Sequence, residues 1–230
     1  MTAQTSFYTR LPKRGLITLS GTDRKAFLQD LVTNDVNLLD TQGCVYACLL
    51  SPQGKFMHDF FTTEENDNLF LDCEGGERAL HLAKVLKMYA LRADVTFDAQ
   101  ESTDIYAVIG QAHGHKDPRH ENIGYRSFDK PTSIDEKPFE EWDHLRISLT
   151  LPDGSRDLII GKSTMDEGNM DQINAIDYNK GCYVGQEITA RMHYRGLGKR
   201  RLQTVNVNTL PEKAELRSSC GEIGIALVRV

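Results

Sequence analysis

Strand-like and helical stretches follow one another irregularly along this chain, and their order constrains the fold more than any other feature of the sequence. Runs rich in apolar and β-branched residues predict strands over residues 15–19, 44–50, 55–62, 69–73, 95–97 and 105–109. The strongest helix signal covers residues 77–91, where apolar side chains recur every three to four positions. Because no repeated strand–helix–strand unit emerges, the sequence predicts an α+β fold.

Residue chemistry places one turn and one helix start in the first half. Residues 51–54 have proline second and glycine fourth, which is typical of a β-turn joining strands 44–50 and 55–62. Thr22 or Asp23 is expected to cap a short helix that follows.

The second half is predicted to be more irregular. It contains a weak strand signal over residues 123–128 and a helix signal over residues 138–148. Residues 151–174 then form a long connection without a clear pattern, and a connection of this length indicates either function or mobility.

Composition excludes several classes of protein. A formal charge of −6, from 27 basic and 33 acidic side chains, is unlike the basic balance of a general nucleic-acid binder. No apolar run approaches the length of a membrane span, and residues 1–14 lack the apolar core of a secretion signal. The cysteines have neither zinc nor disulfide spacing. These features predict a cytoplasmic protein with free thiols and no membrane contact.

The densest chemistry lies in the segment Lys-Gly-Cys-Tyr-Val-Gly-Gln-Glu at residues 180–187. Cys182 precedes a helix-like run, so unpaired backbone N–H groups and the positive end of the helix dipole are expected nearby. Lys180 and Arg191 add positive charge, which favours the thiolate form. The segment thus predicts a reactive sulfur, with an inert packed thiol as the alternative. Its remaining loop members are Gly181, Tyr183, Gly185, Gln186 and Glu187.

This segment resembles the signature of the YgfZ family in the glycine-cleavage T-protein superfamily. The residues that follow, Ile188-Thr189-Ala190-Arg191, are similar to the mitochondrial-type iron–sulfur assembly branch of that family. Further matches are Gly21-Thr22-Asp23, Phe27-Leu28-Gln29, Thr33-Asn34-Asp35-Val36, Gln53-Gly54-Lys55, Leu151-Pro152-Asp153-Gly154 and Arg156-Asp157-Leu158, so that the resemblance covers residues 15–205.

The resemblance implies interwoven α/β halves around a central channel that binds tetrahydrofolate or another reduced folate. It also implies an accessory role in assembling or repairing iron–sulfur proteins, with assembly factors or client iron–sulfur enzymes as partners. Cys182 then becomes the functional sulfur with Lys180 beside it, and Asp59, Arg146 and Arg191 become candidate folate contacts. The folate-binding region is expected over residues 1–198, with any internal boundary near 111–121. A truncated remnant of the family's C-terminal β-barrel is expected over residues 199–230.

The alternative function is that of a folate-dependent aminomethyltransferase of the T-protein type. T-proteins carry an aspartate pair after their glycine turn, whereas this chain has His58-Asp59, so Asp59 alone would have to serve the folate nitrogen. Whether the chain is an enzyme is therefore left open.

Two polar clusters allow more than one interpretation. A basic group near the C-terminus fits either the anionic tail of a folate or a solvated surface; its members are Arg191, Arg195, Lys199, Arg200 and Arg201. A second group, formed by His113, His115, Asp117 and His120, is interpreted as a solvated loop and not a metal site, and no metal is predicted. Cys44 and Cys48 are expected in the core.

Overall fold

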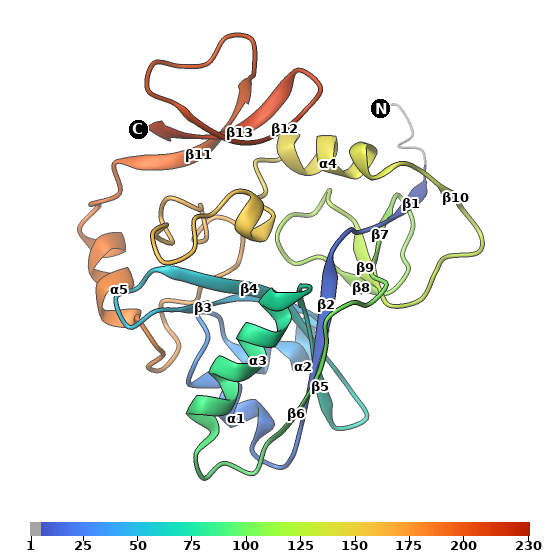
Figure 1. The fold of residues 1–230 in the computed structure, drawn as a ribbon, viewed down its shortest axis with the longest axis vertical. Coiled ribbons are helices and arrows are strands. Elements are labelled where there is room, and N and C mark those ends of the chain that lie inside the picture. The colour runs from blue at the N-terminus through green and yellow to red at the C-terminus, as the bar shows by residue number, and fades with distance from the viewer. Residues whose placement is uncertain (1–5) are drawn as a thin grey trace.

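The computed structural model describes residues 6–230, which form three β-sheets with short helices packed against them (Figure 1). The sequence predicts no secretion signal over residues 1–14. Residues 1–5 of this segment lie outside the described residues. The mixture of mainly antiparallel sheets and separate helices confirms the predicted α+β class. Within residues 6–230, no helix has the length and apolar character needed to cross a bilayer.

The first sheet has five strands in the order β3-β4-β5-β2-β6, and all neighbours are antiparallel. Each strand overlaps one that the sequence predicts: β2 (Arg14–Ser20), β3 (Val45–Leu50), β4 (Phe56–Glu65), β5 (Asn68–Glu74) and β6 (Thr96–Gln100). The predicted turn joins β3 to β4. The Gly54 N–H donates to the Ser51 carbonyl at 2.8 Å, and Gly54 takes a φ of +69°, which glycine adopts without strain.

Helices pack against this sheet and complete its core. The predicted long helix is α3 (Glu77–Ala90), whose apolar stripe includes Leu82 and Leu86 and packs with sheet residues such as Leu71. Three shorter elements lie between β2 and β3, namely α1 (Arg24–Gln29), η1 (Val36–Leu38) and α2 (Leu39–Gln42). Asp23 is the N-cap residue of α1, although its side chain makes no capping hydrogen bond.

The second sheet has the order β10-β1-β7-β9-β8, with β1 parallel to β10 and antiparallel to β7. Its strands are β1 (Phe7–Arg10), β7 (Tyr106–Ile109), β8 (His115–Lys116), β9 (Tyr125–Ser127) and β10 (Asp135–Glu136). The interpretation of residues 111–121 as a solvated loop is wrong for Asp117. Its side chain is 2% exposed because it forms a buried ion pair with Arg119 at 2.7 Å.

The C-terminal sheet is open and antiparallel, in the order β11-β13-β12. It consists of β11 (Arg200–Asn206), β12 (Glu215–Cys220) and β13 (Ile223–Arg229), and these strands do not close into a barrel. Helix α4 (Phe139–Ser148) packs against β12 and β13. Leu202, Ile225 and Leu227 share the larger hydrophobic core with Trp142, so the sheet is integrated into the molecule.

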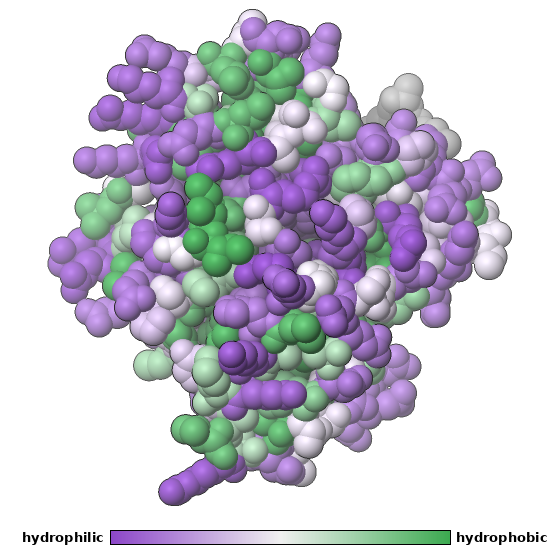
Figure 2. Space-filling view, viewed as in Figure 1, coloured by the Kyte–Doolittle hydropathy of each residue, from purple (hydrophilic) through white to green (hydrophobic). Residues whose placement is uncertain are grey.

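The connection from α4 to α5 (Gln186–Tyr194) contains one short regular element, the 3-10 helix η2 (Gly154–Arg156). The rest of it consists of turns, bends and irregular backbone, in agreement with the predicted irregular stretch over 151–174. The connection crosses the middle of the molecule, between the C-terminal sheet and the first sheet (Figure 1). The face seen in Figure 2 is mostly hydrophilic, and its apolar side chains lie in small separate groups.

Candidate functional site

Cys182 is exposed in a loop that leads directly into α5. The next residue, Tyr183, is buried and anchors the loop in the larger core. Gly185 then takes a φ of +84° as the N-cap residue of α5, and a Cβ there would meet the Ser51 carbonyl at 2.7 Å. The loop therefore presents the sulfur to solvent while both of its ends are packed against the rest of the protein.

Lys180 fastens this loop to the N-terminal half of the chain. Its Nζ donates to the backbone carbonyls of Gln29, Val32 and Asn34 at 2.7, 2.7 and 2.8 Å. Burial lowers the pKa of Lys180 to about 8, although nearby acids act in the opposite direction. The ammonium group thus has a complete set of backbone acceptors, and its contacts are those of an anchor for the loop.

The remaining loop side chains are only loosely held. Gln186 Nε2 donates to the Gly181 carbonyl at 3.5 Å. Glu187 forms an exposed ion pair with Arg191 at 3.3 Å, one helical turn further along α5. An exposed pair of this kind stabilises a helix by only about 0.3–0.5 kcal/mol. Both side chains can therefore exchange this contact for another at little cost.

The other cysteines lie in different surroundings. Cys44, Cys48 and Cys73 are buried, which confirms that Cys44 and Cys48 are core residues, and burial raises the pKa of all three thiols. Cys220 is half-buried, and its Sγ donates to the Glu140 carbonyl at 3.4 Å. Cys182 is therefore the one exposed thiol among the five cysteines of the sequence, all of which lie within the described part of the chain.

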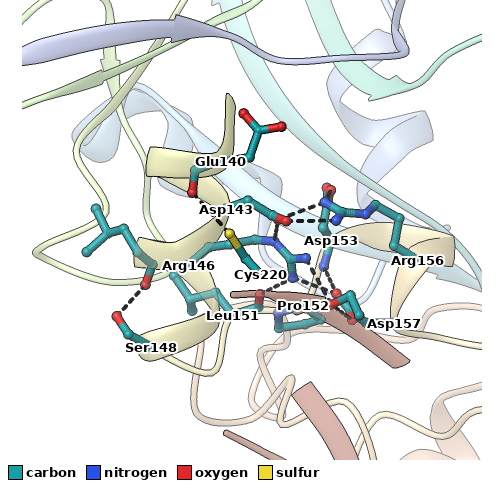
Figure 3. Close-up of polar contacts among 12 residues, drawn as sticks. Glu140, Asp143, Arg146, Ser148, Leu151, Pro152, Asp153, Arg156, Asp157 and Cys220 are labelled. Carbon is teal, nitrogen blue, oxygen red and sulfur yellow. Dashed lines mark hydrogen bonds and ion pairs between the residues drawn. The ribbon is translucent and has the colours of Figure 1, made fainter. Parts of the chain in front are cut away.

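Arg146 is 0% exposed and belongs to a buried ion network (Figure 3). Its guanidinium donates to Asp143 at 2.6 Å, to Asp157 at 2.7 Å, to the Leu151 carbonyl at 3.1 Å and to Ser218 at 3.0 Å. These partners come from α4, from the connection and from β12. The network ties the C-terminal sheet to the middle of the molecule. The folate contact at Arg146 stays a prediction, and it would require Arg146 to exchange one of these partners for the ligand.

Asp59 is also occupied by the protein itself. Its Oδ2 accepts a hydrogen bond from the Tyr46 hydroxyl at 2.8 Å, and burial raises the pKa of this carboxyl group. A Cβ on Gly154 would lie 3.1 Å from Asp59 Oδ1, so the connection passes close to the other oxygen. The neighbouring His58 is buried against His81, with 2.8 Å between Nε2 of the first ring and Nδ1 of the second. Asp59 is thus a largely buried carboxyl group, and one of its oxygens is already hydrogen-bonded to Tyr46.

Several cavities have the size of ligand sites, with volumes of about 370 to 590 Å³. One of them, of about 590 Å³, lies between the connection and β11, and Asn169, Gln172 and Arg201 are among its lining residues. Another, of about 490 Å³, is lined by residues of 41–44, 116–121 and Asn174. Neither is lined by Asp59, Arg146 or Arg191. Arg201, from the predicted basic group, is the member of that group that faces the larger cavity.

Sequence reasoning missed the ion network at Asp72 on β5. This carboxylate accepts hydrogen bonds from Arg14 on β2 and from Arg126 on β9, which belong to different sheets. The guanidinium carbon of Arg126 also lies 3.8 Å from the centre of the Phe61 ring. Charged residues spaced along predicted strands were the available signal, but the pairing joins residues that are far apart in sequence.

The fold is that of the aminomethyltransferase T proteins of the glycine cleavage system. The crystal structure of that protein from Bartonella henselae superposes with a TM-score of 0.74, covering 99% of this chain and 79% of the other. The two sequences are 13% identical, so the likeness establishes the fold alone.

Sequence comparison leads to a narrower group of relatives. The mitochondrial iron–sulfur cluster assembly factor IBA57 homologue of Neurospora crassa is 31% identical over 84% of this chain, and that of Mycosarcoma maydis is 30% identical over 87%. Human IBA57 is 27% identical over 95% of this chain. The chain spans 52% and 57% of the two fungal proteins and 76% of the human one. No protein-family model matches the chain.

These relatives correct the predicted location. All three carry the word mitochondrial in their names, so the expectation of a cytoplasmic protein is wrong. That expectation depended on free cysteines together with the lack of a secretion signal and of a membrane span. These features indicate a reducing environment without specifying which compartment provides it.

Proposed function

We propose that this chain is an accessory factor in the assembly or repair of iron–sulfur proteins. We further propose that it belongs to the YgfZ/IBA57-like branch of the T-protein superfamily. It would then act in the mitochondrial type of pathway. The fold and the relatives support the general role. Its partners are then assembly factors or client iron–sulfur enzymes.

The observation that carries the proposal is the position of Cys182. Its thiol is exposed at the start of α5, whereas Cys44, Cys48 and Cys73 are sealed in the interior. A sulfur that transfers or transiently binds iron, or that exchanges with a partner's thiol, must be reachable by another protein. The Lys180 anchor supports this role because it holds the loop in place without covering the sulfur.

We also propose that the chain binds a reduced folate in the cavity of about 590 Å³. This cavity is large enough for such a ligand, and its amide and guanidinium groups suit a polar ring system with an anionic tail. Calorimetry with tetrahydrofolate provides the test, and Gln172→Ala in the cavity wall is expected to weaken binding. If calorimetry detects no binding of tetrahydrofolate to the parent protein, the folate proposal is overturned. The proposed role of Cys182 is not affected by that result.

The aminomethyltransferase alternative gains no support from the described residues. The carboxylate that it requires is Asp59, which is buried and accepts a hydrogen bond from the Tyr46 hydroxyl. Asp59 would have to give up this contact to serve a folate nitrogen with that oxygen.

Cys182→Ala tests the main proposal. In cells that lack their own copy of the factor, the variant is expected to fold normally and to fail to restore the activity of iron–sulfur enzymes. Cys220→Ala, which removes the half-buried thiol, is the matched control and should restore activity. Circular dichroism and urea denaturation of both purified variants separate lost function from lost structure.

Full rescue by Cys182→Ala would remove this sulfur from the mechanism. Failure of both cysteine variants, with normal folding, would show that the effect is not specific to the exposed thiol.

A further inference from the structure

Two acids and a histidine converge outside the Cys182 loop. Asp166 and Asp171 lie on turns of the connection, and His193 lies in the last turn of α5. One ligand atom from each of these side chains lies within 4.8 Å of the other two. Atoms bound to one zinc ion in tetrahedral geometry, with bonds of about 2.0–2.2 Å, lie about 3.3–3.6 Å apart. A shift of up to about 1 Å in each side chain would therefore bring all three atoms to one ion.

The cluster contains buried polar atoms that have no partner. Asp166 is only 4% exposed, and its Oδ1 is buried without a hydrogen bond from any residue of 6–230. The hydroxyl oxygen of Tyr178 is likewise buried and unpartnered, and the Tyr178 ring stacks on His193 with 3.9 Å between centroids. A buried carboxylate oxygen without a partner is strongly unfavourable in an otherwise satisfied interior. A bound cation would remove this penalty.

The charge balance of the cluster suits a divalent cation. Asp171 is held by Arg201 through two hydrogen bonds, of 2.8 and 3.1 Å. This pairing orients the carboxylate and leaves a further lone pair on each oxygen. With His193 neutral, the two carboxylates and Arg201 sum to one negative charge, so a divalent ion would meet net attraction. A Cβ added at Gly198 would lie 3.1 Å from the Asp166 carboxylate. The backbone at Gly198 therefore leaves little space on that side of the carboxylate.

We propose that Asp166, Asp171 and His193 form a binding site for a first-row divalent transition-metal ion. One imidazole nitrogen with two carboxylate oxygens is a donor set that suits zinc, manganese or ferrous iron better than calcium or magnesium, which prefer oxygen alone. Zinc binds most tightly of these three in the usual order of affinities. Water would complete its coordination.

The site joins helix α5, which follows the Cys182 loop, to the connection that borders the proposed folate cavity. His193 lies at the end of α5, and the loop that carries Cys182 leads into the beginning of the same helix. Asp166 and Asp171 belong to the connection, so a bound ion would tie this connection to the far end of α5. The inference does not depend on the role of Cys182, and its test is carried out in a variant without that thiol.

The test is zinc titration by calorimetry of tag-free, chelator-treated Cys182→Ala protein. We expect one zinc ion per chain, and we expect Asp166→Asn and His193→Gln each to lower the affinity more than about 100-fold, beyond the usual effect of outer-shell changes. His144→Gln, which removes an exposed histidine from α4, is the matched control and should bind as the parent does. Cobalt substitution should give a visible ligand-field spectrum that Asp166→Asn abolishes.

Thermal unfolding keeps the test informative if a variant is less stable. Zinc should raise the melting temperature of the parent and of His144→Gln but not that of Asp166→Asn, because only binding to the folded state shifts that equilibrium. Zinc affinity that is unchanged in both Asp166→Asn and His193→Gln would overturn the proposal. Absence of any zinc binding by the parent would overturn it as well, and would indicate that water satisfies these atoms.

Discussion

His58 lies buried on β4, with its ring stacked on that of His81 at 5.1 Å between centroids. Burial, aided by the charge of Arg78 and by His81, lowers the pKa of His58 from 6.5 to about 3. Between these two values the unfolded chain takes up a proton at this position and the folded chain does not. The free energy of unfolding therefore falls as the pH decreases through this window.

We predict that His58→Gln removes this part of the acid sensitivity. A histidine in this situation contributes a loss of about 1.4 kcal/mol per pH unit below its unfolded pKa. The stability of the parent relative to the variant should therefore fall by about 2–3 kcal/mol from pH 7 to pH 4.5. Urea denaturation at a series of pH values measures this difference. His144→Gln, at an exposed position, should give a curve parallel to that of the parent, and a parallel curve for His58→Gln would contradict the prediction.

Helix α5 begins against the turn between β3 and β4. The two glycines of the segment 180–187 have different structural roles there. Gly185 has a φ of +84°, and its Cα approaches the turn so closely that a Cβ would lie 2.7 Å from the Ser51 carbonyl. Gly181 has open space around its Cα, and a Cβ at that position would meet no atom within 4 Å. Only Gly185 is therefore required by the packing between α5 and the hairpin.

We predict that Gly185→Ala destabilises the protein by about 1–3 kcal/mol, the usual range for a strained backbone conformation. The contact of the new Cβ with the Ser51 carbonyl should add to this loss. Gly181→Ala should change stability by less than about 0.5 kcal/mol. Urea denaturation gives these values, and hydrogen exchange should show faster opening of α5 in Gly185→Ala alone. Equal effects of the two substitutions would mean that the hairpin contact does not hold the helix start.

Local patterns predicted the elements whose burial repeats along the sequence. β2 alternates buried and half-exposed residues, and α3 buries Leu82 and Leu86 at helical spacing, so both were visible. β12 is largely exposed and the two-residue strands β8 and β10 are defined by their partners, so no local signal marks them. The loop around Cys182 was found from its residues. The anchoring of Lys180 was not, because its acceptors lie at the other end of the chain.

Asp72 connects the first two sheets across the interior of the whole molecule. Its carboxylate binds Arg14 of the first sheet at 2.7 Å and Arg126 of the second at 2.8 Å, and all three side chains are at most 10% exposed. Buried charges of this kind depend on each other, since removal of one leaves the others without compensation.

We predict that Asp72→Ala lowers the free energy of unfolding by about 3–5 kcal/mol, because two buried guanidinium groups lose their shared acceptor. Asp98→Ala, at an exposed position of β6 in the same sheet, is the control and should cost less than about 0.5 kcal/mol. Denaturation followed by both fluorescence and circular dichroism measures the change. A loss below about 1 kcal/mol for Asp72→Ala would show that the two sheets are joined mainly by apolar contacts.

The three bonds from Lys180 to the backbone of Gln29, Val32 and Asn34 have a consequence for encounters with other proteins. The segment that bears the thiol becomes rigid when the chain folds. A partner that binds the sulfur would therefore not have to order a flexible loop. Less freedom is lost at the moment of contact, and association is favoured to that extent. In the proposed role of Cys182, Lys180 would thus promote recognition through the rigidity of the loop and not through its charge.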